Sequence, residues 1–173
     1  MDLSELEKNR HEMNISLESI EYIIKTIKNN KLKNVLEIGT FNGYSALKLS
    51  AAAKQVTTIE IDKVAAEIAK SNFVKYKSSN IKILIGDAKE ILRKMNENFD
   101  LVLIDAMKKE YKEYFMHSLR LVKKGFVYAD NTVSHKKYMD DFFECLNKNR
   151  LNWKELGIGK GVVEIRVGVN NGH

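Results

Sequence analysis

The sequence predicts an α/β fold in which helices cover both faces of a doubly wound, mostly parallel sheet. Short apolar runs alternate with longer helical patterns from about Asn34 onward, the order of a βαβ series. Most of these runs are too apolar to have a face in water, as is typical of strands buried between two helix layers. The 173 residues contain no repeat or linker, so a single domain over residues 1–173 is expected.

A helix is expected before the first strand. From Ser16 to about Lys28 the apolar residues fall on one helical face, and Asn29-Asn30 offers a stop. The chain should therefore consist of an N-terminal helical segment over residues 1–30 and a core over residues 34–169.

The core is expected to hold five parallel strands and a closing hairpin. The strands are predicted over residues 34–38, 55–61, 81–85, 99–104 and 125–129, with helices between them over residues 44–53, 63–76, 88–95 and 112–122. A further helix is predicted over residues 134–149, with Tyr138, Phe142, Cys145 and Leu146 on its inner face. Residues 162–169 alternate like a strand and should pair with residues 153–156, which completes seven strands with an antiparallel end.

Composition excludes several classes of protein. Hydrophobic residues make up 44% and charged residues 30%, which is ordinary for a folded domain. No apolar run is long enough to span a membrane and the first residues are too charged for a secretory signal, so a cytoplasmic protein without a membrane partner is expected. The single cysteine, Cys145, cannot form an internal disulfide, and four scattered histidines give no zinc spacing. The net charge of +6 allows anionic partners without identifying nucleic acid.

The junction after the first strand predicts a nucleoside site, because ligands of such sheets bind beyond the carboxyl ends of the strands. In VLEIGTFNGYSAL, Gly39 and Gly43 let the backbone turn tightly and approach a ligand. The spacing is not that of a dinucleotide fingerprint or a Walker loop. Glu37, at the strand end, opposes a pyrophosphate and favours a ligand that carries a sulfonium and an ammonium group.

The next two junctions suit a ribose and a base. Glu60 follows Gly39 by twenty-one residues, a position from which a carboxylate accepts hydrogen bonds from both ribose hydroxyls. Asp87, after the third strand, either binds the edge of an adenine or caps the helix that begins there.

The fourth and fifth junctions suggest a metal. LVLIDAMKKEY and YADNT place Asp105, Asp130 and Asn131 at the ends of neighbouring strands, an oxygen-only set that suits Mg²⁺ or Ca²⁺. Lys108 follows Asp105 by three residues and could reach the same place. Taken singly, these residues could be helix caps, a turn residue and a solvated charge, but suitable groups at all five junctions favour a site.

At these residues the chain resembles the class I S-adenosylmethionine-dependent methyltransferases, and among them the metal-dependent catechol and caffeoyl-CoA type O-methyltransferases. The block LEIGTFNGYSAL is similar to their cofactor segment, and IDAMKKEY followed by ADN is similar to their metal and catalytic segments. The resemblance runs from about Ser16 to Val167. It implies a Rossmann-like fold and an enzyme that moves a methyl group to a hydroxyl of a small catechol-like aromatic acceptor.

The resemblance also implies residue roles. The methionine part of the cofactor would be wrapped by Glu37, Gly39, Thr40, Gly43, Tyr44 and Ser45, the ribose taken by Glu60 and the adenine by Asp87 and Ala88. Ile61, Gly86 and Asp105 complete the expected S-adenosylmethionine site. Asp105, Asp130 and Asn131 match the metal ligands of the family, with Mg²⁺ the expected ion, and Lys108 matches its catalytic lysine. As a base, Lys108 requires that burial outweigh the neighbouring carboxylates and leave its amine neutral.

Three features of the sequence depart from the family pattern. Met107 stands where many members have a second aspartate, the stretch before the first strand is short, and GIGKG replaces an acidic Gly-Asp-Gly before the last strand. The wall of the acceptor pocket is therefore open to question. Trp153 either lines that pocket or belongs to the core.

Other functions stay open at this stage. A tRNA base hydroxyl is the alternative acceptor, with a phosphate-binding surface formed by Lys25, Lys28, Lys31, Lys33, Lys136 and Lys137 around the site. A non-catalytic cofactor-binding module is disfavoured by the intact Asp105, Lys108, Asp130 and Asn131 set, and a nicotinamide enzyme by the glycine spacing. A homodimer is possible.

Overall fold

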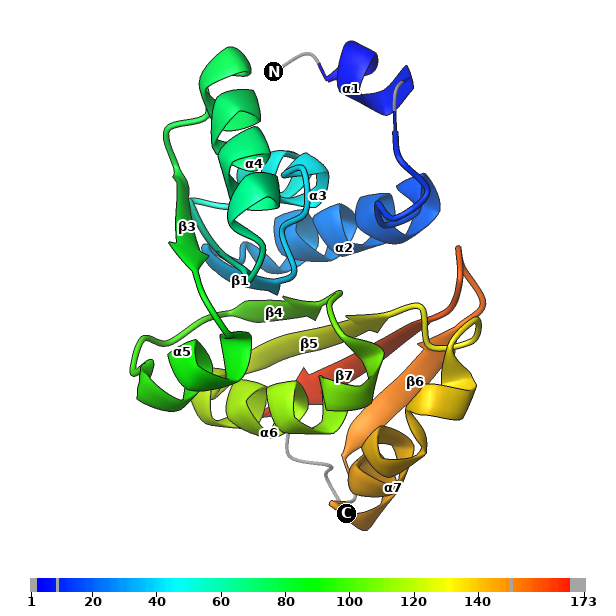
Figure 1. Ribbon diagram of the computed structural model, residues 1–173. Coiled ribbons are helices and arrows are strands. Elements are labelled where there is room, and N and C mark those ends of the chain that lie inside the picture. The colour runs from blue at the N-terminus through cyan, green and yellow to red at the C-terminus, as the bar shows by residue number, and fades with distance from the viewer. Residues whose placement is uncertain (1–2, 9, 150, 169–173) are drawn as a thin grey trace.

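A seven-stranded sheet runs through the centre of the computed structural model, which describes residues 3–8, 10–149 and 151–168 (Figure 1). The strands are β1 (Asn34–Ile38), β2 (Gln55–Glu60), β3 (Ile81–Ile85), β4 (Leu101–Ile104), β5 (Gly125–Asp130), β6 (Asn152–Leu156) and β7 (Val162–Val167). Their order is β3-β2-β1-β4-β5-β7-β6. The first five are parallel, and β7 runs antiparallel to both β5 and β6. The predicted mixed sheet with an antiparallel end is confirmed.

Helices cover both faces of this sheet, as predicted. They are α1 (Ser4–Lys8), α2 (Leu17–Asn30), α3 (Tyr44–Ser50), α4 (Lys63–Lys75), α5 (Ala88–Lys94), α6 (Tyr111–Leu121) and α7 (Asp140–Lys148), with short 3₁₀ turns η1 (Lys108–Glu110) and η2 (Lys136–Tyr138). Figure 1 shows α2, α3 and α4 on one side of the sheet and α5, α6 and α7 on the other. Each side has its own core of buried apolar side chains, represented by Ile23 and Leu47 on the first and by Leu92 and Phe142 on the second. No helix in the described ranges is long and apolar enough to cross a membrane.

Side-chain caps fix where several helices begin. The Ser16 hydroxyl accepts a hydrogen bond from the backbone N–H of Ser19 at the start of α2. Asp62 accepts from Val64 N and Ala65 N at the start of α4. Such caps satisfy backbone donors that the first helical turn leaves free, so α2 and α4 begin close to their predicted positions.

Some predicted bounds are too wide by one to three residues. The helix predicted over residues 44–53 ends at Ser50, β2 ends at Glu60 and not at Ile61, and β4 begins at Leu101 and not at Phe99. Strand β3 lies at the edge of the sheet and keeps a partly wet face, with Ile85 38% exposed.

The prediction of a continuous helix over residues 134–149 is wrong. Residues 132–135 form a turn, η2 follows, and α7 begins only at Asp140. The backbone N–H groups of Val133 and Ser134 donate to the carbonyl of Lys160, and that of Thr132 donates to Gly161 O, so contacts with the loop before β7 replace helical hydrogen bonds. Tyr138 is consequently 42% exposed instead of lying on an inner face, whereas Phe142, Cys145 and Leu146 are buried as predicted.

The C-terminal hairpin is anchored on both faces. On one face Trp153 packs beside Phe143, with ring centroids 6.0 Å apart, which favours the core role for this tryptophan. On the other, the carboxylate of Glu164 is buried and accepts hydrogen bonds from Tyr22 of α2 and Tyr128 of β5. The predicted strand over residues 162–169 ends at Val167 in the structure, and Val169 lies outside the described residues.

Candidate functional site

The ends of β1 and β4 meet in backbone contact at the predicted ligand edge. Gly39 follows β1 with φ +101°, and its N–H donates to Ile59 O at 3.0 Å. A Cβ on Gly39 would lie 2.1 Å from the carbonyl oxygen of Asp105, the first residue after β4. Only glycine fits here, because both the φ angle and the space exclude a side chain. The loop after β1 is thereby pressed against the residue predicted to bind metal.

Glu37 is a buried acid with one unpaired oxygen. Its side chain is fully buried, one oxygen accepts the Thr58 hydroxyl at 2.6 Å, and Oε1 has no hydrogen-bond partner. Burial raises the pKa of Glu37 from 4.5 to about 8, while the hydroxyls of Ser45 and Thr58 act in the opposite direction. A cationic ammonium group would satisfy the unpaired oxygen and favour the ionised acid, so the residue fits the predicted cofactor.

Glu60 organises the loop that follows β1. One of its oxygens accepts hydrogen bonds from Thr40 N at 3.1 Å and Phe41 N at 2.7 Å, and the other accepts from Asp62 N at 2.9 Å. These contacts hold Phe41 in a left-handed conformation with φ 49°. A carboxylate has about four acceptor positions, so capacity for a ribose hydroxyl remains after the three backbone donors.

The other predicted cofactor residues have diverse surroundings. Thr40 is hydrogen-bonded to Thr58, Ser45 lies beside Glu37, and a Cβ on Gly43 would meet the ring of Phe73 at 2.5 Å. The Tyr44 side chain is fully buried in the same apolar core as Ile23 and Leu47.

The segment expected to bind adenine holds a helix cap. Asp87 caps α5 by accepting from Lys89 N at 2.8 Å, and Gly86 precedes it with φ +150°. Ala88 is buried in the core, whereas Ile61, after β2, is 69% exposed. The capping role of Asp87 is thus present, and Ile61 offers an apolar surface beside Glu60.

The predicted catalytic residue, Lys108, belongs to a connected chain of hydrogen bonds. Lys108 Nζ lies 2.8 Å from Asp105 Oδ1 and 2.8 Å from the Tyr111 hydroxyl. The Tyr111 hydroxyl donates to the backbone carbonyl of Asp130 at 3.1 Å. Burial raises the pKa of Tyr111 well above 10, so its proton is retained for that bond. The chain ties the end of β4 to the end of β5.

Asp105, Asp130 and Asn131 lie together as predicted, and their chemistry fits a hard cation. Asp130 is 1% exposed, and its Oδ1 is buried without a hydrogen-bond partner. Burial, followed by the charge of Asp105, raises the pKa of Asp130 to about 7. A divalent cation would offset both effects. Asn131 has φ 64° and donates its side-chain amide to Asp130 Oδ2.

This donor set is smaller than a complete protein-built metal cage. Within the described residues no group of three or more His, Cys, Asp or Glu side chains is placed to hold a metal ion. The set provides two carboxylates and one amide, which suits Mg²⁺ because that ion keeps several waters or substrate oxygens.

The predicted phosphate-binding surface does not form. Lys31 and Lys33 directly precede β1 and so lie at the amino edge of the parallel strands, whereas Lys136 and Lys137 follow β5 at the carboxyl edge. Lys25 and Lys28 belong to α2, which covers one face of the sheet. The six lysines therefore do not surround the site, because they are divided between the two edges of the sheet and one of its faces.

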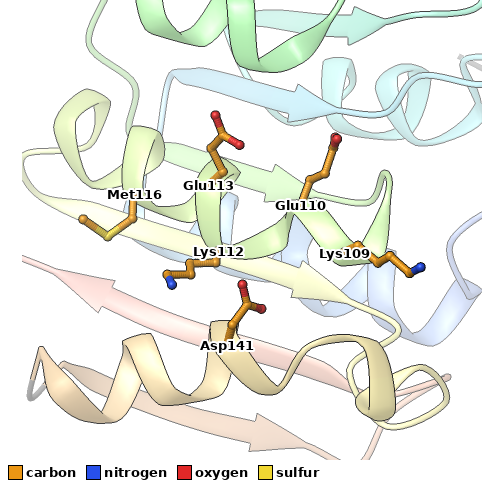
Figure 2. A pocket seen from close by; sticks show the side chains of 6 residues that line it. All are labelled: Lys109, Glu110, Lys112, Glu113, Met116 and Asp141. Atoms are coloured by element: carbon orange, nitrogen blue, oxygen red, sulfur yellow. The ribbon is translucent and has the colours of Figure 1, made fainter.

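A surface hollow of about 390 Å³ lies against α6 and α7, beside η1 (Figure 2). It is lined by Lys109, Glu110, Lys112, Glu113, Met116 and Asp141. Charged side chains of both signs dominate this lining, and none of the predicted site residues contributes to it. We interpret it as a solvated groove.

Three residues that support the site were not singled out from the sequence. Tyr111 stands one turn after Lys108, a spacing that could have indicated contact. Thr58 faces Glu37 across the register that pairs β1 with β2. The backbone of Phe41 binds Glu60, and nothing in the sequence signals this contact.

Gly39→Ala should destabilise the protein by more than about 3 kcal/mol, because the left-handed φ and the overlap with Asp105 O act together. Gly157→Ala is the matched control, since a Cβ there meets nothing within 4 Å and should change stability by less than about 0.5 kcal/mol. Urea denaturation of both variants measures the difference. Equal stabilities would contradict the described contact.

The raised pKa of Glu37 predicts a pH dependence of stability. Between about pH 4.5 and pH 8 the unfolded chain releases the Glu37 proton while the folded protein retains it, so the free energy of unfolding falls as pH rises. Glu37→Gln should remove this contribution and be more stable than the parent protein at about pH 7.5, with a smaller difference at about pH 5. Denaturation of both proteins without ligands at each pH tests this. Parallel pH profiles would show that Glu37 titrates normally.

The comparisons with known proteins agree with this architecture. Residues 3–156 match the family model described as O-methyltransferase. A catechol O-methyltransferase of Niastella koreensis is 36% identical over 118 residues, which cover 63% of this chain and 53% of the relative. A caffeoyl-CoA O-methyltransferase of Populus kitakamiensis is 34% identical over 131 residues, covering 70% of this chain and 56% of the relative. The chain thus spans about half the length of the curated relatives it matches.

The chain covers a larger share of the solved structures that it matches than of the curated relatives. A provisionally named caffeoyl-CoA O-methyltransferase of Staphylococcus aureus superposes with a TM-score of 0.84 at 27% identity, covering 96% of this chain and 90% of that one. The SAH-bound methyltransferase PaMTH1 of Podospora anserina superposes with a TM-score of 0.85 at 24% identity, covering 94% and 85%. The family match, over most of the chain, and the shared seven-stranded fold lead to one conclusion: the chain belongs to the O-methyltransferase family.

Proposed function

We propose that the protein transfers the methyl group of S-adenosylmethionine to a hydroxyl of a small aromatic diol, with a divalent cation, Mg²⁺ by preference. The observation that carries this proposal is the cluster of Asp105, Lys108, Asp130 and Asn131 directly beside the Glu37–Gly39 loop. A protein that only bound the cofactor would have no use for such a cluster. Relatives named for catechol and caffeoyl-CoA support a diol acceptor.

Cofactor binding is assigned to the first three strand ends. Glu37 would hold the ammonium group, because its unpaired oxygen needs a donor. Glu60 would take the ribose hydroxyls with its remaining acceptor capacity. The exposed Ile61 would cover one face of the adenine, and the Asp87 segment would meet its edge. The SAH-bound relative from Podospora anserina supports a cofactor of this type.

Metal binding is assigned to Asp105, Asp130 and Asn131. The ion, when bound, would supply a Lewis acid that lowers the pKa of a hydroxyl beside it. Asp130 would provide the unpaired Oδ1, and Asp105 an oxygen not bonded to Lys108.

Lys108 is the group to which we assign the acceptor proton. Asp105 and Tyr111 hold its amine in place, at the edge that the loop after β1 also reaches. S-adenosylmethionine, when bound, would supply the methyl group on a sulfonium, and the electron pair of the broken methyl–sulfur bond would stay with sulfur as the acceptor oxygen took the methyl group. The hydroxyl proton passes to the Lys108 amine, which has to be neutral beforehand.

Calorimetry with S-adenosylmethionine tests whether the protein binds the cofactor, on which every other assignment depends. The cofactor should bind without metal, and catechol should bind to the loaded protein only when Mg²⁺ is present. Absence of cofactor binding would overturn the proposal. Cofactor binding without methylation of any diol would support a non-catalytic binding module instead.

Lys108→Ala should lower turnover by roughly 10²-fold or more, the usual effect of removing a general base, with little change in cofactor affinity. Lys112→Ala is a suitable control, because Lys112 lines the solvated groove on α6 (Figure 2). Initial rates with a catechol acceptor, together with calorimetry, provide the two measurements. An unimpaired rate in Lys108→Ala would remove this residue from the mechanism.

A further inference from the structure

Two buried threonines lie between the acids assigned to the cofactor. Thr58 stands opposite Glu37 in the parallel register of β1 and β2, and Thr40 lies in the loop after β1. Val35 and Val56, two residues earlier on the same strands, belong to the core under α2, α3 and α4. Because side chains alternate along a strand, Glu37 and Thr58 point to that same face of the sheet.

These side chains form a continuous chain of short hydrogen bonds. Thr58 Oγ1 donates to Glu37 Oε2 at 2.6 Å, and the hydroxyl oxygens of Thr40 and Thr58 lie 2.6 Å apart. A hydroxyl has a single proton, and that of Thr58 is used on Glu37, so Thr40 is the donor to Thr58. The chain therefore runs from Thr40 through Thr58 to Glu37 and presents a proton to the carboxylate.

The backbone of Thr40 extends this chain to Glu60. The Thr40 N–H donates to Glu60 Oε2 at 3.1 Å. Thr40 thus contacts the acid assigned to the ribose directly and reaches Glu37, the acid assigned to the ammonium group, by way of Thr58. One connected network holds both acids in place.

Among these four residues, the network is open at a single side-chain oxygen. Both oxygens of Glu60 accept backbone N–H groups, and both threonine hydroxyls are bonded. Glu37 Oε1 is buried without a partner. A network that served only to join two strands would be expected to satisfy its buried atoms, because a buried unpaired oxygen is costly. The open position therefore indicates where a donor from outside the chain would bind.

The charges near Glu37 indicate what kind of donor that would be. The charged side chains that act on it most strongly are those of Asp105 and Glu60, and both are negative. The hydroxyls of Ser45 and Thr58 favour its ionised form. In such surroundings a positively charged donor binds Oε1 better than a neutral one.

We propose that Thr58 is a positioning residue that makes the site selective for the ammonium group of the cofactor. By donating to Oε2, Thr58 holds the Glu37 carboxylate in the orientation that leaves Oε1 free for the ammonium group. Thr58 acts through Glu37 and need not touch the cofactor itself. This inference rests on the proposed methyltransferase function and specifies how the site recognises the amino-acid part of its cofactor.

Two ligands that differ only in the ammonium group measure this selectivity. They are S-adenosylhomocysteine (SAH) and its desamino analogue, 4-(5′-adenosylthio)butanoate. Calorimetry should show that the parent protein binds SAH at least about tenfold more tightly, because the analogue leaves the buried oxygen of Glu37 unpaired. The measurement requires no turnover, acceptor or metal.

Thr58→Val should lower the ratio of the two affinities by about fivefold, because valine keeps the branched shape of threonine but cannot donate. The change should appear in the binding of SAH and not in that of the analogue. Thr58→Ser retains the hydroxyl and should keep the parent ratio. Thr57→Val is the matched control, since Thr57 is also buried on β2 but points to the opposite face of the sheet.

A double-mutant cycle with Glu37→Gln shows whether Thr58 acts through Glu37. Glu37→Gln should already lose the selectivity, so adding Thr58→Val should not change the ratio further. A threonine that only stabilised the fold would weaken both ligands in both backgrounds. If Thr58→Val does not fold, Thr58→Cys replaces it and should also lower the ratio, because a thiol is a weak donor.

The outcomes distinguish the two proposals. If Thr58→Val keeps the parent ratio or weakens both ligands equally, the positioning role is refuted while the methyltransferase function stands. If the parent protein binds both ligands equally well, Glu37 does not read the ammonium group, and the inference fails together with that assignment. If neither ligand binds, the proposed function fails and the inference fails with it.

Discussion

The adjacency of β1 and β4 determines where everything else in the candidate site can lie. The chain leaves β1 toward β2 and β3 and returns to the other side of β1 with β4, so the loops after these two strands diverge and leave a crevice. At its floor Gly39 touches the Asp105 carbonyl. Topology alone thus brings the residues proposed to bind the cofactor and those proposed to bind a metal to the two sides of one crevice.

Burying acidic side chains at this edge lowers the stability of the ligand-free protein. Glu37 and Asp130 each bury an oxygen without a partner, and both titrate near neutrality because their charged forms are poorly solvated. The fold remains stable despite this cost because an apolar core packs against each face of the sheet. Ligands of opposite charge would relieve it, so the strain is concentrated where binding would occur.

The mixed sheet, its antiparallel end and the residues that stand at the strand ends could be predicted because they depend on local pattern. Apolar runs separated by helical spacing define the strands, and parallel strands place their carboxyl ends at one edge. The predictions that failed concern features set by contacts between segments that are distant in the sequence. Residues 134–139 do not continue a helix because the loop at Lys160 takes their backbone donors. Thr58 and the Phe41 backbone act through partners that become neighbours only after folding.

Asn131 combines two demands that few amino acids can meet. Its backbone is left-handed, with φ 64°, its side-chain amide donates to Asp130 Oδ2, and in the proposed metal site its side-chain oxygen would be a ligand. Glycine would supply the backbone without the oxygen, and glutamine the oxygen without the short side chain that eases this conformation. Aspartate meets both demands but would place a third negative charge against a pair that already repel each other. A single exchange at this position therefore gives up the turn, the proposed ligand oxygen or the balance of charge.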